Sequence, residues 1–411
     1  MQVPLVRDRR KWWMLSFAFL ATVINYLNRQ TLSVMAPMLL QQFRMSAASY
    51  SEVVFAFMLA YTVMNGVSGR LLDRLGTRIG YGLTIAFWSG AELLNALSSG
   101  TLSLGIFQFL LGVGEAGNYP AGVKLITEWF PPEERSHASG IFNSGASIGA
   151  ILAPPLTAWI MLTTNWRTAF VVIGLLGFVW LAAWLAVYRG PHNVDRRDQA
   201  DRIPLRMLLR SKFLWQFTLS KVFSDPAWYF YVFWFPQYLK VAHSFSLREI
   251  GETAWIPFFT ATIGNLAGGA VFTGLSRAGA SSATARRIAI LIFSALMTSA
   301  IFVGEIRSAI VCILLISVAT FGYAGALANL LAVPGDVFPK GAVASIWGFA
   351  SMGSGFGGML SSLATGWLVD HYSFQPAFVL FGLIPLLSAW IVWKLPRQTD
   401  TTHWQPQASL S

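Results

Sequence analysis

The stretch EWFPPEERSHASGIFNSGASIGA, residues 128–150, decides the fold, because the chain carries a second copy of its pattern. The stretch DVFPKGAVASIWGFASMGSGFGG, residues 336–358, aligns with it at a constant offset of 208 residues. Both copies contain, in the same order, an acidic residue, a Phe-Pro pair and three glycines, paired as Glu128/Asp336, Phe130/Phe338, Pro131/Pro339, Gly140/Gly348, Gly145/Gly353 and Gly149/Gly357. The ordered series indicates an internal duplication, so we expect two related halves.

A long polar stretch lies between the two copies, near the middle of the chain. It reads YRGPHNVDRRDQADRIPLRMLLRSK, residues 188–212, and it is rich in charge and poor in apolar residues. We interpret most of it as a cytoplasmic linker. The predicted domains are an N-terminal half over residues 1–188, the linker over 189–212, a C-terminal half over 213–396 and a cytoplasmic tail over 397–411.

Apolar runs of membrane-spanning length fill both halves. The chain is 55% hydrophobic and 11% charged, whereas soluble domains carry about 25% charged residues. A membrane-spanning helix needs about 20 predominantly apolar residues. Twelve runs approach or exceed this length, at 14–36, 50–71, 79–97, 101–127, 137–160, 168–188, 213–238, 250–275, 287–304, 308–333, 342–368 and 374–394. They lack the period-two alternation of barrel strands. The predicted fold class is an all-α membrane protein with twelve transmembrane helices in two pseudo-symmetric six-helix halves.

The positive charge is distributed unevenly over the loops. The formal net charge is +11, which in a soluble protein would suggest a nucleic-acid partner. With both termini cytoplasmic, the twelve runs place 21 of the 29 lysines and arginines inside, five outside and three within spans. Cytoplasmic loops of membrane proteins carry this excess, so the charge indicates orientation and we expect no nucleic-acid partner. The first run lacks a small-residue cleavage site and is interpreted as a retained helix.

A short motif lies between the second and third runs. It reads GRLLDRLGTR, residues 69–78, and has the form G-x-x-x-D-R-x-G-x-R. Its glycines permit a tight turn, and Asp73 with Arg74 and Arg78 can form a charge lock between helix ends. We assign these three residues to gating. The motif resembles the cytoplasmic loop motif of the major facilitator superfamily.

Four longer stretches resemble the anion:cation symporter family of that superfamily, and within it the bacterial hexuronate (galacturonate/glucuronate) transporters. They are INYLNRQTLSVMAP (24–37), GEAGNYPAGVKLITEWFPPEERSHASGIFNSGASIGAILAPPL (114–156), DPAWYFYVFWFPQYL (225–239) and VPGDVFPKGAVASIWGFASMGSGFGGML (333–360). The resemblance implies proton-coupled uptake of a sugar-acid monoanion, a hexuronate or a related aldonate or aldarate, by alternating access across a bacterial inner membrane. The chain departs from many members at Asn28, where they carry aspartate, and from some at Gln108, where they carry arginine.

Two charged residues deep in the runs of the first half are the main candidates for function, since charges inside a membrane are costly. Arg29 shares a helix face with Asn25 and Tyr26, and its guanidinium fork suits carboxylate binding. Glu115 has Asn118 one turn further along, and burial favours its protonated form. We predict that Arg29, Asn25, Tyr26 and Asn118 bind substrate and that Glu115 carries the proton. The alternative is a structural ion pair between Arg29 and Glu115.

The seventh run contains a second pair of charges. Lys221 and Asp225 lie one turn apart, so they either pair with each other or serve a site, and Asp225 is the second candidate for proton coupling. Pro226 can kink the helix. Trp228 and Tyr229, one turn beyond Asp225, are candidates for stacking on the C–H face of a sugar.

Further polar residues complete the predicted substrate site. Asn329 and Ser351 are candidate partners for substrate hydroxyls, although isolated polar residues in membrane helices more often join two helices. The family resemblance assigns anion contact to Tyr26, Arg29 and Tyr61.

Other classes of function are disfavoured. The five histidines lie near predicted loops or termini and the one cysteine, Cys312, lies in an apolar run, so we expect no metal site and no internal disulfide. There is no GxxxxGK[ST] motif for ATP and no catalytic cluster, so we predict no cofactor, no enzyme activity and no obligate protein partner. The alternatives are a non-transporting membrane receptor and a proton-coupled exporter of organic anions or drugs. Such exporters usually carry GPxxGG on the fifth span, where this chain has GASIGAILAPP.

Overall fold

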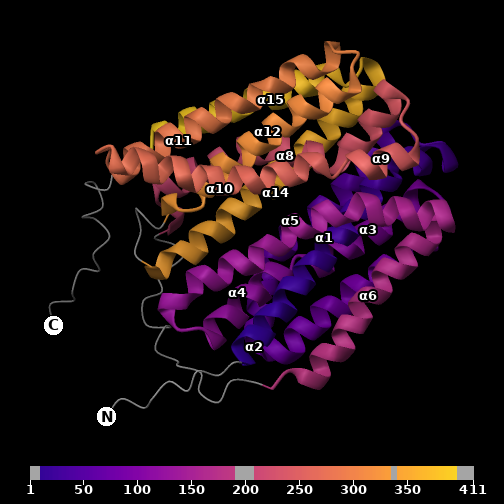
Figure 1. Cartoon of the computed structure of the whole chain (residues 1–411). Coiled ribbons are helices and arrows are strands. Elements are labelled where there is room, and N and C mark those ends of the chain that lie inside the picture. The colour runs from indigo at the N-terminus through magenta and orange to yellow at the C-terminus, as the bar shows by residue number, and fades with distance from the viewer. Residues whose placement is uncertain (1–9, 190–207, 335–339, 396–411) are drawn as a thin grey trace. The chain divides into compact units, whose positions relative to one another are not determined.

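A computed structural model describes residues 10–189, 208–334 and 340–395. These residues are almost entirely helical and contain no strand (Figure 1). The predicted linker lies mostly, and the predicted tail wholly, outside the described residues, and so do Asp336, Phe338 and Pro339 of the repeat.

The helices follow the order of the predicted runs. The first half contains α1 (Arg10–Gln42), α2 (Ala47–Asn95), α3 (Thr101–Glu115), α4 (Asn118–Trp129), α5 (Pro132–Thr163) and α6 (Trp166–Val187). The second half contains α8 (Lys212–His243), α9 (Leu247–Thr253), α10 (Ile256–Arg277), α11 (Ser282–Leu296), the 3₁₀ helix η2 (Met297–Glu305), α12 (Ala309–Leu330), α14 (Lys340–His371) and α15 (Gln375–Trp393). All twelve runs lie on these helices, which confirms the predicted all-α fold.

Several runs differ from single straight helices. The second and third runs form one long element, α2, which is bent in the middle. The fourth run is divided between α3 and α4, and the eighth between α9 and α10. The ninth run continues from α11 into η2. The break in the fourth run matters for function, because Glu115 is the last residue before it.

The bend in α2 lies within the GRLLDRLGTR motif. Gly76 has φ 74° and ψ 161°, a backbone conformation that is not helical. Residues other than glycine rarely adopt this region, at a cost of about 1–3 kcal/mol. The second glycine of the motif, Gly76, is therefore needed because its backbone conformation forms the bend of α2.

We expect Gly76→Ala to lower the stability of the protein by about 1–3 kcal/mol, because alanine is strained at this φ and ψ. Thermal unfolding of the purified protein in detergent measures the change. Gly69→Ala is the matched control, because Gly69 lies on the same helix and a Cβ there would meet nothing within 4 Å. An equal loss in both variants would contradict this account of Gly76.

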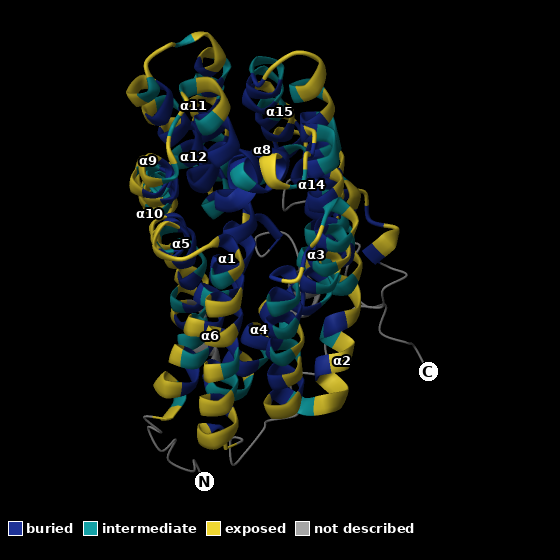
Figure 2. Ribbon diagram, turned by 90° about the vertical axis from the view of Figure 1, so that its right-hand side faces the viewer, coloured by how far each residue is buried: buried dark blue, intermediate teal, exposed yellow. Residues whose placement is uncertain are grey.

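Several helices are suited to a bilayer by length and composition. Among the described residues the segments that qualify are Ala47–Asn95, His137–Thr163, Trp166–Val187, Leu247–Arg277, Ser282–Glu305, Ala309–Leu330 and Gln375–Trp393. Exposed apolar side chains line them, as along α6, where Leu175, Val179 and Leu185 are exposed. Figure 2 shows much of α6 in the colour of exposed residues. An apolar surface of this extent is expected where a protein contacts lipid.

By contact, the described residues form two compact units. The first unit contains those up to position 196 together with Phe233–Trp255, and the second contains positions 197–232 and those from Ile256 onward. The last part of α8 therefore packs within the first unit. There the hydroxyl of Tyr50 donates to the main-chain oxygen of Phe233 at 3.0 Å.

The repeated glycines have the same structural role in both halves. In α5 and α14, two glycines each face a main-chain oxygen of the neighbouring helix, and a Cβ there would lie only 2.5–3.0 Å from that oxygen. The contacts are Gly145 on Phe19 and Gly149 on Val23 in α1, and Gly353 on Thr218 and Gly357 on Val222 in α8. Small residues permit such close approach of membrane helices. The duplication predicted from the sequence thus corresponds to the same close helix contact in both halves, between α5 and α1 in the first and between α14 and α8 in the second.

Candidate functional site

Arg29 and Glu115 form an ion pair inside the first unit. Arg29 comes from α1, and Glu115 ends α3 just before the turn at residues 116–117. Nε and Nη2 of Arg29 donate to the same carboxyl oxygen, Oε2 of Glu115, at 3.2 and 2.9 Å. The side chains are 5% and 0% exposed. The structure therefore contains the ion pair that the sequence left as the alternative to substrate binding by Arg29.

Aromatic rings surround the guanidinium of Arg29. Its Cζ lies 4.6 Å from the ring centroid of Tyr61, 5.1 Å from that of Tyr26 and 5.3 Å from that of Phe57. Cation–π contacts stabilise a desolvated cation by about 2 kcal/mol, and they leave its charge available to an anion. The structure brings the predicted anion contacts Tyr26 and Tyr61 to Arg29. Phe57, which was not predicted, completes the group.

Several polar atoms near this ion pair in the sequence are buried without a hydrogen-bond partner. They are Oε1 of Glu115, Nδ2 of Asn25, and both Nδ2 and Oδ1 of Asn28. Leaving such a group unsatisfied costs about 1–3 kcal/mol, so each one needs an explanation such as a ligand or a proton. Oε1 of Glu115 can accept a proton while Oε2 stays with Arg29. Asn28 is a further candidate ligand, although its position was noted in the sequence only as a departure from the family.

Asn118 joins helices in this structure. Its Nδ2 donates to Oγ1 of Thr22 at 3.1 Å, and its Oδ1 accepts from the hydroxyl of Tyr81 at 2.8 Å. Both ends of the amide thus link α4 to neighbouring helices. Each of these bonds uses one of the two hydrogen-bonding positions at its end of the amide, so the second N–H and the second lone pair stay open to the predicted substrate contact.

The second unit contains another buried ion pair. Nζ of Lys221 lies 2.8 Å from Oδ1 and 2.6 Å from Oδ2 of Asp225. The hydroxyl of Tyr323 donates to the same Oδ1 at 3.2 Å. Both oxygens of Asp225 are therefore engaged, in contrast to Glu115. The structure shows the pairing within one helix turn that the sequence offered as one of two interpretations.

The predicted aromatic residues adjoin this pair. The ring of Trp228 stacks on that of Tyr323, with centroids 5.1 Å apart and planes at 12°, and Phe258 meets Trp228 edge-on at 5.6 Å. The hydroxyl of Tyr229 lies 3.3 Å from Oγ of Ser354. Trp228 and Tyr323 thus form a flat aromatic surface that the Lys221–Asp225 pair holds through the Tyr323 hydroxyl.

Asn329 and Ser351 are placed differently from each other. Nδ2 of Asn329 donates to the main-chain oxygens of Gly268 and Gly325, both at 3.0 Å, so it joins α12 to α10. Ser351 is half-buried on α14. Both amide hydrogens of Asn329 are therefore engaged, which leaves its Oδ1 for the predicted contact with a substrate hydroxyl, and Ser351 likewise stays a candidate ligand.

Extending the repeat toward its N-terminal side pairs Glu115 with Tyr323. The sequence GEAG, residues 114–117, aligns with GYAG, residues 322–325, at the same offset of 208. Tyr323 was not predicted as a site residue, and this extension of the repeat is the signal that would have found it.

The glycine contacts extend the same equivalence to α1 and α8. Gly149 faces Val23 and its repeat Gly357 faces Val222, so Val23 and Val222 are equivalent. Arg29 and Trp228 each lie six residues further along, so they correspond to each other as well. The Arg29–Glu115 ion pair of the first half and the Trp228–Tyr323 stack of the second half therefore occupy equivalent positions. One half presents charge where the other presents an aromatic surface.

The predicted gating residues lie at the bend of α2. Oδ1 of Asp73 accepts from Nζ of Lys124 on α4 at 2.9 Å, and Nη2 of Arg78 donates to the main-chain oxygen of Leu185 at 2.8 Å. Arg74 is exposed. The ion-pair partner of Asp73 is thus a lysine rather than an arginine of the motif. Exposed pairs of this kind contribute about 0–1 kcal/mol.

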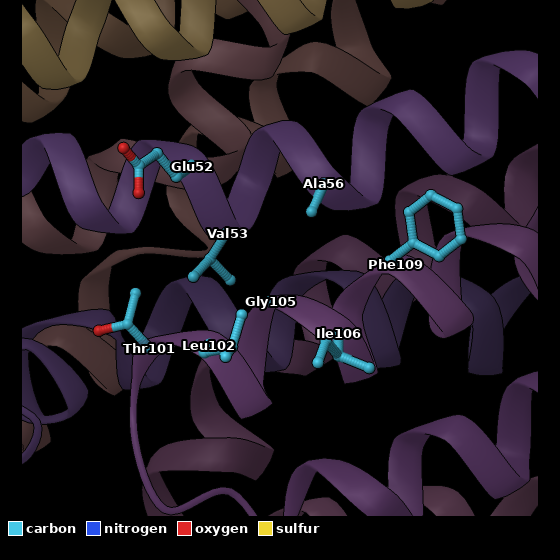
Figure 3. Close-up of a pocket in the computed structure, with 8 residues that line it drawn as sticks. All are labelled: Glu52, Val53, Ala56, Thr101, Leu102, Gly105, Ile106 and Phe109. Carbon is cyan, nitrogen blue, oxygen red and sulfur yellow. The ribbon is translucent and has the colours of Figure 1, made fainter.

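An open groove of about 370 Å³ lies on another part of the first unit. Figure 3 shows side chains of α2, from Glu52 to Ala56, facing side chains of α3, from Thr101 to Phe109. The lining is mostly apolar and contains none of the predicted site residues. The described residues also contain no group of three or more histidine, cysteine or acidic side chains that could hold a metal.

A duplicated helical fold with several helices long and apolar enough to span a bilayer is typical of multi-pass membrane transporters. The family described as the Major Facilitator Superfamily matches residues 18–324 and 280–410. The chain therefore belongs to the major facilitator superfamily.

Named relatives and a solved structure agree with this family. The chain is 32% identical over 402 residues to the hexuronate transporter of Escherichia coli strain K12, with 93% of each chain covered. It is 34% identical over 277 residues to the galacturonate transporter of Dickeya chrysanthemi, covering 63% of this chain and 80% of the relative. A bacterial homologue of the human lysosomal transporter Spinster, in an inward-facing and occupied conformation, matches with a TM-score of 0.76 at 17% identity, over 96% of this chain and 98% of that one. These proteins are transporters, and this chain is likewise not an enzyme.

Proposed function

We propose that this protein is a proton-coupled symporter that imports a sugar-acid monoanion by alternating access across the bacterial inner membrane, with both termini cytoplasmic. The names of its relatives support the substrate class, since they include transporters of hexuronate and galacturonate and a probable L-galactonate transporter of Escherichia coli K12 that is 30% identical. The excess of basic residues in the predicted cytoplasmic loops supports the orientation.

One observation carries the proposal, namely the Arg29–Glu115 ion pair. Arginine stays charged at any physiological pH, so its buried charge needs an anionic partner at all times. Glu115 is that partner in the structure. A substrate carboxylate is chemically equivalent to the Glu115 carboxylate and can replace it. The replacement is possible only when Glu115 becomes neutral, and its unpartnered Oε1 is available for the proton.

The exchange couples one proton to one monoanion. Before binding, the site holds a guanidinium and the Glu115 carboxylate. After binding, it holds the same guanidinium, the substrate carboxylate and a neutral carboxylic acid at Glu115. The net charge of the site is then the same in both states, so neither state leaves an uncompensated charge in a low-dielectric interior.

Other predicted residues have supporting roles in the proposal. The rings of Tyr26 and Tyr61 pack against the Arg29 guanidinium and keep it in position. Asn25 contributes an amide N–H donor that has no partner in the structure. Trp228 and Tyr229 are proposed contacts to the sugar, with Ser351 as a hydroxyl partner. Asp225 stays the second candidate for proton coupling, behind Glu115, because both of its oxygens are engaged. Asp73, Arg74 and Arg78 are the proposed gating residues.

Transport by the purified protein in liposomes tests the proposal. Labelled galacturonate, glucuronate, galactonate and glucarate are supplied with and without an inside-alkaline pH gradient. We expect concentrative uptake of at least one monoanion, which a protonophore abolishes. Uptake that reaches the same level without the gradient would contradict proton coupling, and no uptake of any of the four would contradict the substrate class.

A further inference from the structure

A second glutamate is completely buried in the first unit. Glu92 lies three residues before the end of α2 and its exposed fraction is 0%. Its Oε1 has no hydrogen-bond partner, and its Oε2 lies 3.5 Å from Nδ2 of Asn95. Within the described chain it forms no ion pair. It therefore lacks the cationic partner that Glu115 has in Arg29.

The surroundings of Glu92 favour a neutral carboxylic acid. Burying an unpaired carboxylate costs several kcal/mol, and such a group takes up a proton instead. Glu115 is the acidic residue at the end of the neighbouring helix α3, and a second negative charge beside it would be disfavoured. Arg29 of α1 is engaged with Glu115, and Arg167 of α6 donates to the main-chain oxygen of Ser98 at 3.5 Å.

Two contacts between α2 and α3 place Glu92 beside the helix turn that leads to Glu115. A Cβ on Gly114 would lie 2.7 Å from the main-chain nitrogen of Trp88, one turn before Glu92. At the other end, Nε2 of Gln108 donates to Oδ1 of Asn95 at 3.1 Å. Glu92 lies between these two contacts on α2. Gln108 precedes Glu115 by seven residues, so the two share one face of α3.

Polar side chains continue from Glu92 toward the end of α2. After Asn95, Ser98 is buried, and its Oγ has no hydrogen-bond partner. In the proposed orientation this end of α2 faces the periplasm. A row of buried polar groups thus leads from the outer connection through Ser98, Asn95 and Glu92 toward Glu115, and Glu92 is the titratable member between the surface and that residue.

We propose that Glu92 is a second proton-exchanging carboxyl group, which relays protons between the outer side of the membrane and Glu115. The inference rests on the proposed function. In the relay, the proton of the Glu92 carboxylic acid passes through a bridging water to Oε1 of the Glu115 carboxylate, because the two carboxyl groups are not hydrogen-bonded to each other in this structure, and the negative charge moves to Glu92. A proton from outside then restores the acid at Glu92. Glu115, now neutral, releases Arg29 for the substrate.

Glu92→Gln tests the relay, since glutamine keeps the shape of the neutral acid but cannot transfer a proton. We expect the initial rate of uptake driven by a pH gradient to fall about 100-fold, the lower end of what a positioned proton-transfer group contributes. Substrate counterflow, which needs no net proton transfer, should continue. The infrared band of a buried carboxylic acid that changes on a pH jump should also disappear.

Two further variants make the result specific. Glu52→Gln removes an exposed glutamate from the same helix and should leave both assays unchanged. Glu92→Asp restores a carboxyl group and should recover part of the uptake driven by pH, with a shifted pH profile. If Glu92→Gln does not fold, Glu92→Asp decides, and an unchanged rate and pH profile in that variant would overturn the relay.

The outcomes also separate this inference from the proposed function. Uptake at the wild-type rate in Glu92→Gln, together with failed accumulation in Glu115→Gln, would overturn the relay alone. Accumulation at the wild-type level in Glu115→Gln would overturn the proposed coupling site and, with it, a relay that ends there.

Discussion

Arg29→Lys is expected to weaken substrate binding about 10- to 150-fold although it keeps the positive charge. Lysine lacks the planar fork that binds a carboxylate through two parallel hydrogen bonds. A hydrogen bond to a charged group contributes about 1.5–3 kcal/mol, which corresponds to this range. The compact ammonium would also lose the flat contact with the rings of Tyr26 and Tyr61. Binding of labelled substrate to the purified variant in detergent measures the loss.

Arg167→Lys is the matched control for this experiment. Arg167 also lies against an aromatic ring, 4.2 Å from the centroid of Trp166, but its nearest polar contact is the main-chain oxygen of Ser98. The same substitution there should leave substrate affinity unchanged. Equal affinity in Arg29→Lys and the wild type would remove Arg29 from the substrate site and leave only its ion pair with Glu115.

Glu115→Gln is expected to abolish concentrative uptake while preserving exchange. Glutamine imitates the protonated acid, so Arg29 is permanently released from its internal partner and can bind substrate. Counterflow of unlabelled against labelled substrate should therefore proceed. With no proton to release inside, an imposed pH gradient should produce no more substrate inside than outside.

The pH dependence of binding gives a second readout at Glu115. In the wild type the substrate competes with the Glu115 carboxylate for Arg29, so affinity should fall as rising pH removes the proton from Glu115. In Glu115→Gln this competition is absent, and affinity should change little with pH. Glu52→Gln should keep the wild-type profile. Wild-type accumulation in Glu115→Gln would move the coupling elsewhere, with Asp225 as the next candidate.

The two halves support a division of labour within one duplicated fold. Equivalent positions hold the Arg29–Glu115 pair in the first half and the Trp228–Tyr323 stack in the second. A sugar acid has a charged carboxylate and an uncharged body of C–H and hydroxyl groups, and these need different kinds of contact. In the proposed function, a charge pair that can be exchanged serves the carboxylate, and an aromatic surface fixed by Lys221–Asp225 serves the C–H groups of the sugar.

The sequence by itself determined the helical architecture. Apolar runs about 20 residues long predict membrane helices because every backbone polar group inside a bilayer has to be paired within its own helix. The Phe-Pro and glycine series predicted the duplication. The structure explains why the glycines recur, because Gly145 and Gly353 each lie against the main chain of a neighbouring helix. The cost of burying charge in a membrane was also sufficient to single out Arg29 and Glu115 from their positions within apolar runs.

Only the tertiary structure decided which polar groups meet. The sequence offered Glu115 as an alternative partner for Arg29, but residues 86 positions apart are brought together by helix packing, and it is packing that leaves Oε1 of Glu115 without a partner. Asn118 and Ser351 looked alike as candidate ligands, yet Asn118 is engaged between helices. Glu92 lies toward the end of a predicted span and is nevertheless completely buried. In a chain whose helices are apolar on every side, hydrophobic periodicity does not reveal which face turns inward, so these partners depend on the packing of the helices.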